Sequence, residues 1–116
     1  MGVKFVNNFA TTISGAVNSS VTTIPIASAA GFPTLVGSDY AYCTLYAESP
    51  FRLEIVKVTA VSGTNLTVIR AQESTTAEAF PIGSAFELRI TAAGLNEVSD
   101  AAISVDNATA LAIALG

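Results

Sequence analysis

A two-residue alternation of apolar and polar side chains runs through the middle of this 116-residue chain and decides its fold class. Between Phe51 and Val61, apolar residues alternate with charged or hydroxyl residues, apart from one break in phase at Ile55–Val56. Because successive side chains of a strand point to opposite faces, the pattern predicts a long β-strand, in which Ile55–Val56 is either a β-bulge or a stretch buried on both faces. Turn residues at 62–65 predict a hairpin that returns through Leu66–Arg70.

Shorter segments repeat this pattern on both sides of the hairpin. Pro25 marks Thr23–Ile26 as an edge strand or a strand end, because proline cannot donate a ladder hydrogen bond. Tyr40–Tyr46 and Phe86–Ile90 have the composition of two further strands. The chain thus offers six or seven short strands in roughly 90 residues, with turn residues about every 8–12 positions and no βαβ unit. We predict a mainly β fold, a small antiparallel β-sandwich or barrel of six to seven strands.

The composition changes after Ile90, and we divide the chain into a β-domain at 1–91 and an alanine-rich C-terminal tail at 92–116. Thr91 is suited to cap a helix at the start of this tail. Alternating three- and four-residue spacing predicts a thin helix or a weak coiled coil, formed by Leu95, Val98, Ala102, Val105, Thr109 and Ala112. A strand is the alternative, because Leu111, Ile113 and Leu115 alternate with alanines; we favour the helix.

In either form the isolated tail exposes an apolar stripe, and its charged residues are all acidic. Charged residues make up 12% of the whole chain, where ~25% is usual, so we expect partners to cover part of the surface. We therefore expect the tail to pack against symmetry mates or a neighbouring protein. The residues assigned to this subunit or partner packing are Leu95, Val98, Ile103, Leu111, Ile113 and Leu115.

The charge balance and the absence of long apolar runs bear on the kind of partner. With five lysines and arginines and a net charge of −4, the chain is a poor match for nucleic acid, whose binding depends on basic side chains that neutralise phosphate. No apolar run approaches the ~18 residues of a membrane helix, and no secretory signal peptide is visible. We expect neither nucleic acid nor membrane among the partners.

The sequence contains no catalytic constellation that we can identify. It has no histidine, which removes the commonest general base and metal ligand. Cys43 stands alone in an apolar run and is expected to be a small buried side chain. Glu54 and Glu87 occupy the polar phase of their strands, the pattern of a solvated face. We expect no enzyme activity, no metal and no cofactor.

One polar segment, Arg70–Ala77, follows a strand without being rich in glycine or proline. It is either a structured loop held by Arg70 and Glu73, which caps the barrel, or a contact surface. Arg70, Gln72 and Glu73 are our candidates for orienting this loop or meeting the partner. The charged residues on adjacent strands also alternate in sign, which favours cross-strand ion pairs of ~0.2–1 kcal/mol each.

Three tyrosines, Tyr40, Tyr42 and Tyr46, share one strand phase. Three rings on one face can stack on sugar rings, which makes a carbohydrate-binding β-module one functional alternative. The same spacing is also that of an inward-facing core stripe, and we favour the core.

Several segments together resemble a small β-domain of tailed-bacteriophage virion proteins, found near the N-terminus of tail fibres and in related tail or head appendage and decoration proteins. The resemblance spans roughly residues 5–95. The matching segments are Asn8–Thr12, Thr22–Ile26, Ala30–Pro33, Glu54–Ala60, Leu66–Ala77 and Phe86–Ala93. The family pattern after the arginine reads Arg-Gly-Gln-Glu-Gly-Thr, and here Ala71 and Ser74 stand in place of the two glycines.

The resemblance implies a structural adaptor, located in the virion, that attaches a fibre or appendage to the tail, baseplate or head and performs no chemistry. It also implies a homotrimer that contacts other virion proteins. Many relatives continue into a long receptor-binding region, whereas this chain ends at Gly116, so we expect a short adaptor or a decoration subunit. The alternative within structural proteins is a capsid decoration (cement) protein that covers a junction between capsomers.

Overall fold

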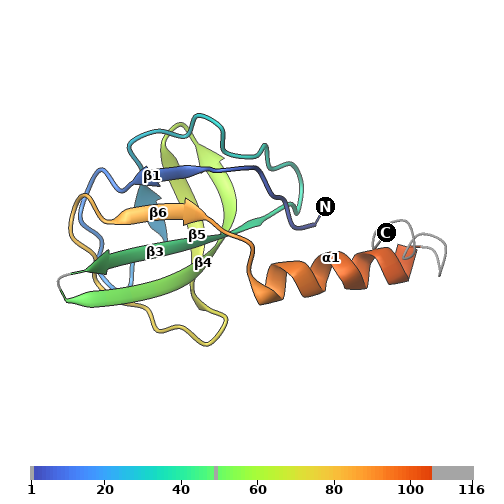
Figure 1. Cartoon of the computed structure of the whole chain (residues 1–116). Helices are drawn as coiled ribbons and strands as arrows, with labels where there is room; N and C mark the ends of the chain where they lie inside the picture. Colours follow the sequence, from blue (N-terminus) through green and yellow to red (C-terminus); the bar gives the residue numbers. More distant parts are fainter. Residues whose placement is uncertain (1, 49, 106–116) are drawn as a thin grey trace.

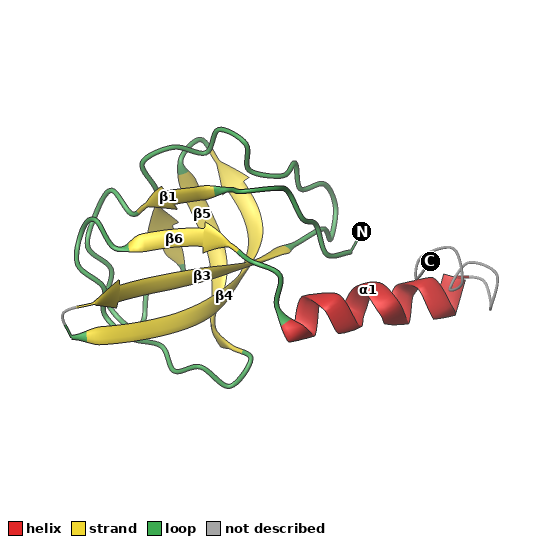
Figure 2. Cartoon of the chain, in the orientation of Figure 1, coloured by secondary structure: helices red, strands yellow, loops and turns green. Residues whose placement is uncertain are grey.

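The computed structural model describes residues 2–48 and 50–105, with side chains up to Val98. A curled β-sheet forms the body of the protein, and one helix extends away from it (Figure 1; Figure 2). The strands are β1 (Ala10–Thr12), β2 (Thr23–Pro25), β3 (Ala41–Glu48), β4 (Phe51–Ser62), β5 (Asn65–Gln72) and β6 (Ala85–Leu88), and the helix is α1 (Ala92–Val105).

All six strands belong to a single sheet in the order β1-β6-β3-β4-β5-β2, and each neighbouring pair is antiparallel. The sheet curls so far that its two edges touch just beyond β1 and β2, where Ile13 and Ile26 form an isolated antiparallel bridge. Two backbone hydrogen bonds flank this bridge, from Ser14 N–H to the Pro25 carbonyl (3.0 Å) and from Ala27 N–H to the Thr12 carbonyl (2.8 Å). The predicted mainly β, antiparallel fold is confirmed as a curled half-barrel; a seventh strand and a sandwich are not confirmed.

The inside of the curled sheet holds the hydrophobic core. β3 contributes Ala41, Cys43 and Leu45, the strands β4 and β5 contribute valines and a leucine from alternate positions, and the loops add large residues such as Phe80. Cys43 is fully buried, and this burial raises the pKa of its thiol. The prediction of a small, buried side chain at Cys43 is therefore confirmed.

The phase of β4 differs from the one that we expected. Its inward-facing residues are Glu54, Val56 and Val58, all fully buried, whereas Phe51 is exposed. The expectation of a solvated Glu54 is therefore wrong. The physical reason is that β4 carries apolar residues on both phases, and the inward phase is the one that lets Glu54 meet an arginine from β5.

The break in phase at Ile55–Val56 lies beside an irregularity in the β4–β5 ladder. Ile55 pairs with Gln72 and Lys57 with Ile69, so a two-residue step on β4 faces a three-residue step on β5. This register shift is the β-bulge alternative, with the extra residue on the β5 side. A second register shift lies between Val58 and Ala60 in the same pair of strands.

The helical prediction for the tail is confirmed over Ala92–Val105. Thr91 caps the helix, because its Oγ1 accepts a hydrogen bond from the Gly94 N–H (3.1 Å). The rest of the tail, with Leu111, Ile113 and Leu115, lies outside the described residues, and the choice between helix and strand stays open there. No helix in the described part of the chain combines the length and apolar character needed to cross a membrane.

The end of β5 and the loop that follows it have an unusual backbone. Ala71, Glu73 and Ser74 have φ angles of 54°, 53° and 67°, in the left-handed region that side chains with a Cβ rarely adopt. Ala71 and Ser74 are the two positions at which the phage pattern that the sequence resembles has glycine. The chain therefore keeps a left-handed conformation at both positions even though the residues that favour it are absent.

This strain predicts that glycine stabilises the protein at both positions. We expect Ala71→Gly and Ser74→Gly each to raise the free energy of unfolding by about 0.5–1 kcal/mol, because removing Cβ relieves the left-handed backbone. Urea denaturation measures the change. Ala10→Gly in β1, where φ is not positive, is the matched control and should lose about 0.5–1 kcal/mol. Equal losses in all three variants would contradict the interpretation.

Candidate functional site

A buried ion pair joins Glu54 of β4 to Arg70 of β5 on the inner side of the curled sheet. Arg70 follows Leu66 and Val68 on the inward phase of β5, so its side chain points to the same side as that of Glu54. The contact is bidentate, with Nε donating to Glu54 Oε2 and Nη2 to Oε1, both at 2.8 Å. Side-chain exposure is 8% for Arg70 and 0% for Glu54. We call this pair the Glu54–Arg70 clamp.

Every hydrogen-bonding group of the clamp has a partner. Arg70 donates its remaining N–H groups to the carbonyls of Asn18 (2.7 Å), Val21 (2.9 Å) and Glu78 (2.7 Å). The Glu54 carboxylate also accepts the backbone N–H groups of Ala71 (2.9 Å) and Glu78 (3.0 Å). All five guanidinium N–H bonds are therefore used. The clamp joins the β1–β2 loop, β4, β5 and the β5–β6 loop.

The charge state of Glu54 follows from these contacts. Burial alone raises the pKa of a carboxyl, but the hydrogen bonds from Arg70, Ala71 and Glu78 outweigh it, so the pKa of Glu54 lies below its ordinary value. The clamp is thus a charged pair at neutral pH. Its geometry leaves no lone pair or N–H group directed at a ligand, so its role is to hold the four segments together.

Four side chains fasten the start of α1 to the sheet, and we call them the helix latch: Tyr40, Tyr42, Glu73 and Glu97. Glu73 reaches from the β5–β6 loop to the helix, where its Oε1 accepts the Ala93 N–H (3.0 Å). Glu97 reaches back from the helix and accepts hydrogen bonds from the hydroxyls of Tyr40 and Tyr42, the latter at 3.0 Å. A carboxylate at the first helical turn also interacts favourably with the helix dipole.

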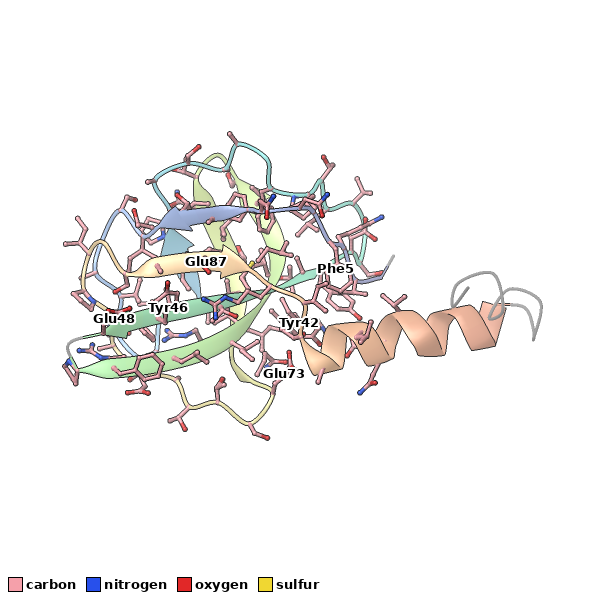
Figure 3. The ribbon with its side chains drawn as sticks, viewed as in Figure 1. Phe5, Tyr42, Tyr46, Glu48, Glu73 and Glu87 are labelled. Atoms are coloured by element: carbon pink, nitrogen blue, oxygen red, sulfur yellow. The ribbon has the colours of Figure 1, made fainter. Side chains whose placement is uncertain are left out.

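The latch brings α1 into close contact with the sheet at Gly94. A Cβ at this position would lie 3.1 Å from the Phe5 ring and 3.4 Å from the Tyr42 ring. Figure 3 shows Phe5, Tyr42 and Glu73 gathered around the beginning of the helix. The absence of a side chain at Gly94 therefore lets the first turn of α1 lie directly on these aromatic residues.

The structure places the predicted loop residues in two roles. Arg70 belongs to the clamp and Glu73 to the latch. The Gln72 side-chain amide Nε2 donates a hydrogen bond to the Arg70 carbonyl (3.1 Å). Their arrangement corresponds to a structured loop held by Arg70 and Glu73. The predicted packing residues Leu95 and Val98 are 59% and 39% exposed on α1. Ile103 lies within α1, but its side chain is not described.

The three tyrosines do not line the core. Ala41, Cys43 and Leu45 take the inward phase of β3, so Tyr42 and Tyr46 are on its outer face, and Tyr40 precedes the strand in the same phase. Tyr42 is buried, but the start of α1 covers it, not the core inside the sheet. The expectation of an inward-facing stripe of tyrosines is therefore wrong. Tyr46 lies beneath Arg89, whose guanidinium carbon is 5.0 Å from the ring centre.

Tyr46 also borders a shallow pocket of about 320 Å³ at the end of the sheet away from α1, lined in addition by Glu48, Ile82 and Ser84 (Figure 3). Tyr42 does not reach this pocket, so the three rings form no open stacking face. Within the described residues, no group of three or more cysteine, aspartate or glutamate side chains is placed to hold a metal ion.

A scan against protein-family models finds no match for this chain, and a search of the curated proteins finds none.

Sequence reasoning identified Arg70 and Glu73 but missed Glu54, Tyr40, Tyr42 and Glu97 in their actual roles. A signal for the clamp was present, because Glu54 shares its phase with Val56 and Val58, and Arg70 shares its phase with Leu66 and Val68. Two opposite charges on the apolar phases of hairpin strands indicate a buried pair. No such signal marks the latch, because its tyrosines are 55 or more residues from Glu97.

The clamp predicts a large difference between two arginines. Arg70→Ala should lower the free energy of unfolding by about 3–5 kcal/mol, because it leaves a fully buried carboxylate without its counter-charge. Arg89→Ala removes an exposed pair with Glu87 and should cost about 0–1 kcal/mol. Urea unfolding compares the two variants, and losses of similar size would contradict a structural role for the clamp.

The latch predicts loss of helix docking at alkaline pH. Burial, with the Glu97 hydrogen bond and charge, raises the pKa of Tyr40 to about 12, whereas the ordinary value is 10.0. Because the folded-state pKa is the higher one, the stabilisation is complete below pH 10 and disappears as the pH rises through about 12. Tyrosinate absorbance and hydrogen exchange of the α1 amides should change together over this range.

Glu97→Ala is the control for this titration. Without the carboxylate, Tyr40 should titrate closer to its ordinary value, and the α1 amides should exchange faster even at neutral pH. Unchanged exchange in this variant would show that Glu97 does not hold the helix.

Proposed function

We propose that this protein is a structural component of a bacteriophage virion, an adaptor that attaches a fibre or appendage to the tail, baseplate or head. The observation that carries the proposal is the helix α1, which is latched to the sheet at its base and leaves Leu95 and Val98 exposed beyond it. A folded β-sheet body with exposed apolar residues on an extending helix suits a protein whose role is to bind other subunits. The resemblance of residues 5–95 to the phage β-domain supplies the class of particle.

The arrangement of charges supports the same proposal. Glu54 and Arg70 satisfy each other inside the domain, and Glu73 and Glu97 bind the helix and the tyrosines. These carboxylates serve to fix the shape of the protein, so the proposed role requires no chemistry and no cofactor. We propose a homotrimer and neighbouring virion proteins as the partners, with neither nucleic acid nor membrane among them.

The fold supports a rigid adaptor body. We propose that the curled sheet acts as a small closed barrel, since the bridge between Ile13 and Ile26 joins its two edges. Closure removes free sheet edges, which would otherwise invite pairing with strands of other chains. Contacts would then be confined to the helix and to the outer surface of the barrel.

Particle composition tests the proposal. We expect the protein in purified virions at a few copies, at one position on the tail, baseplate or head in an electron-microscopy map. Many copies spread over the head would favour a capsid decoration protein in its place. Absence from purified particles, with the protein present in infected cells, would contradict both.

A further inference from the structure

The exposed face of α1 has the spacing of a coiled-coil seam. Leu95, Val98, Ala102 and Val105 follow one another at intervals of three, four and three residues, the a and d positions of two heptads. Leu95 and Val98, whose side chains are described, are both exposed. Their neighbours on the turn, Gly94 and Glu97, are covered by the sheet or bound to its tyrosines.

We propose that this seam binds the same seam of the other copies in the proposed homotrimer, with the helices parallel and in register. The inference deepens the proposed function and rests on it only for its biological setting. A heptad seam is complementary to itself when the helices run in parallel, since each a or d residue then meets its own counterpart.

The acidic residues of α1 occupy heptad positions that are compatible with binding another copy of the same acidic chain. Glu97 occupies a c position, where it is held by Tyr40 and Tyr42, and Asp100 occupies an f position. Between Leu95 and Val105 the e and g positions beside the seam are Ser99 and Ala101, and neither residue is charged. The acidic side chains of this stretch, Glu97 and Asp100, therefore lie outside the e and g positions.

The latch gives the interface a defined starting point. Because Glu73 and Glu97 hold the first turns of α1 on the sheet, the seam begins at Leu95 in every copy, directly beside the barrel. Parallel pairing places all barrels at one end of the assembly and aligns Leu95 with Leu95. An antiparallel partner would instead bring the far end of its own helix against this barrel.

Disulfide trapping of the full chain tests the orientation and the register. Val98→Cys should form a disulfide-linked dimer on mild oxidation, because parallel d positions bring the two cysteines within bonding distance. Asn96→Cys, on the same turn at a b position, is the matched control and should remain monomeric on a denaturing gel. The native Cys43 is fully buried and does not compete.

Light scattering on substitutions in the seam tests the surface itself. Leu95→Glu should raise the dissociation constant by at least about tenfold, because it places a carboxylate in the apolar seam of every copy. Ile82→Glu makes the same change at an exposed site near the other end of the sheet and should leave the mass unchanged.

A monomer at all concentrations, or equal cross-linking of the Val98→Cys and Asn96→Cys variants, would overturn the proposal. These outcomes are independent of the proposed function. A chain that pairs through α1 but is absent from particles retains this interface and loses the adaptor role. A chain that is found in particles as a monomer loses the interface and the homotrimer but retains the adaptor role.

Discussion

The buried pair between Glu54 and Arg70 is the interaction on which the rest of the structure depends. Two opposite charges inside a small curled sheet are costly to desolvate, and they are tolerated only when each has its full set of hydrogen-bond partners. Here the carboxylate accepts four hydrogen bonds and the guanidinium donates five, most of them to or from backbone groups. The pair therefore determines the path of two loops as well as the spacing of two strands.

The position of the helix follows from the path of one of these loops. Immediately after Arg70, the chain turns through left-handed residues at Ala71, Glu73 and Ser74, and this turn carries Glu73 to the first amides of α1. Glu97 completes the connection in the opposite direction by binding the two tyrosines around the start of β3. The interior ion pair and the surface helix are thus linked through a few consecutive residues.

Periodicity was sufficient to predict the main strands, the buried Cys43 and the helix that starts after Thr91, because each depends on neighbours in the sequence. It failed for the orientation of β4, where Leu53 and Ile55 compete with Val56 and Val58 for the inward phase. That choice depends on Arg70 in the next strand, since a one-residue slip would move every side chain to the other face. The latch joins residues too distant in sequence for any local pattern to indicate.

The fastening of α1 at its base has a mechanical consequence. A helix of 14 residues acts as a lever about 21 Å long, at ~1.5 Å per residue. A tilt of about 10° at the latch would displace its far end by nearly 4 Å, which exceeds the ~1.5 Å rise of a whole residue. Small changes in the contacts of Glu73 and Glu97 at the base of α1 would therefore produce large displacements at the far end of the helix.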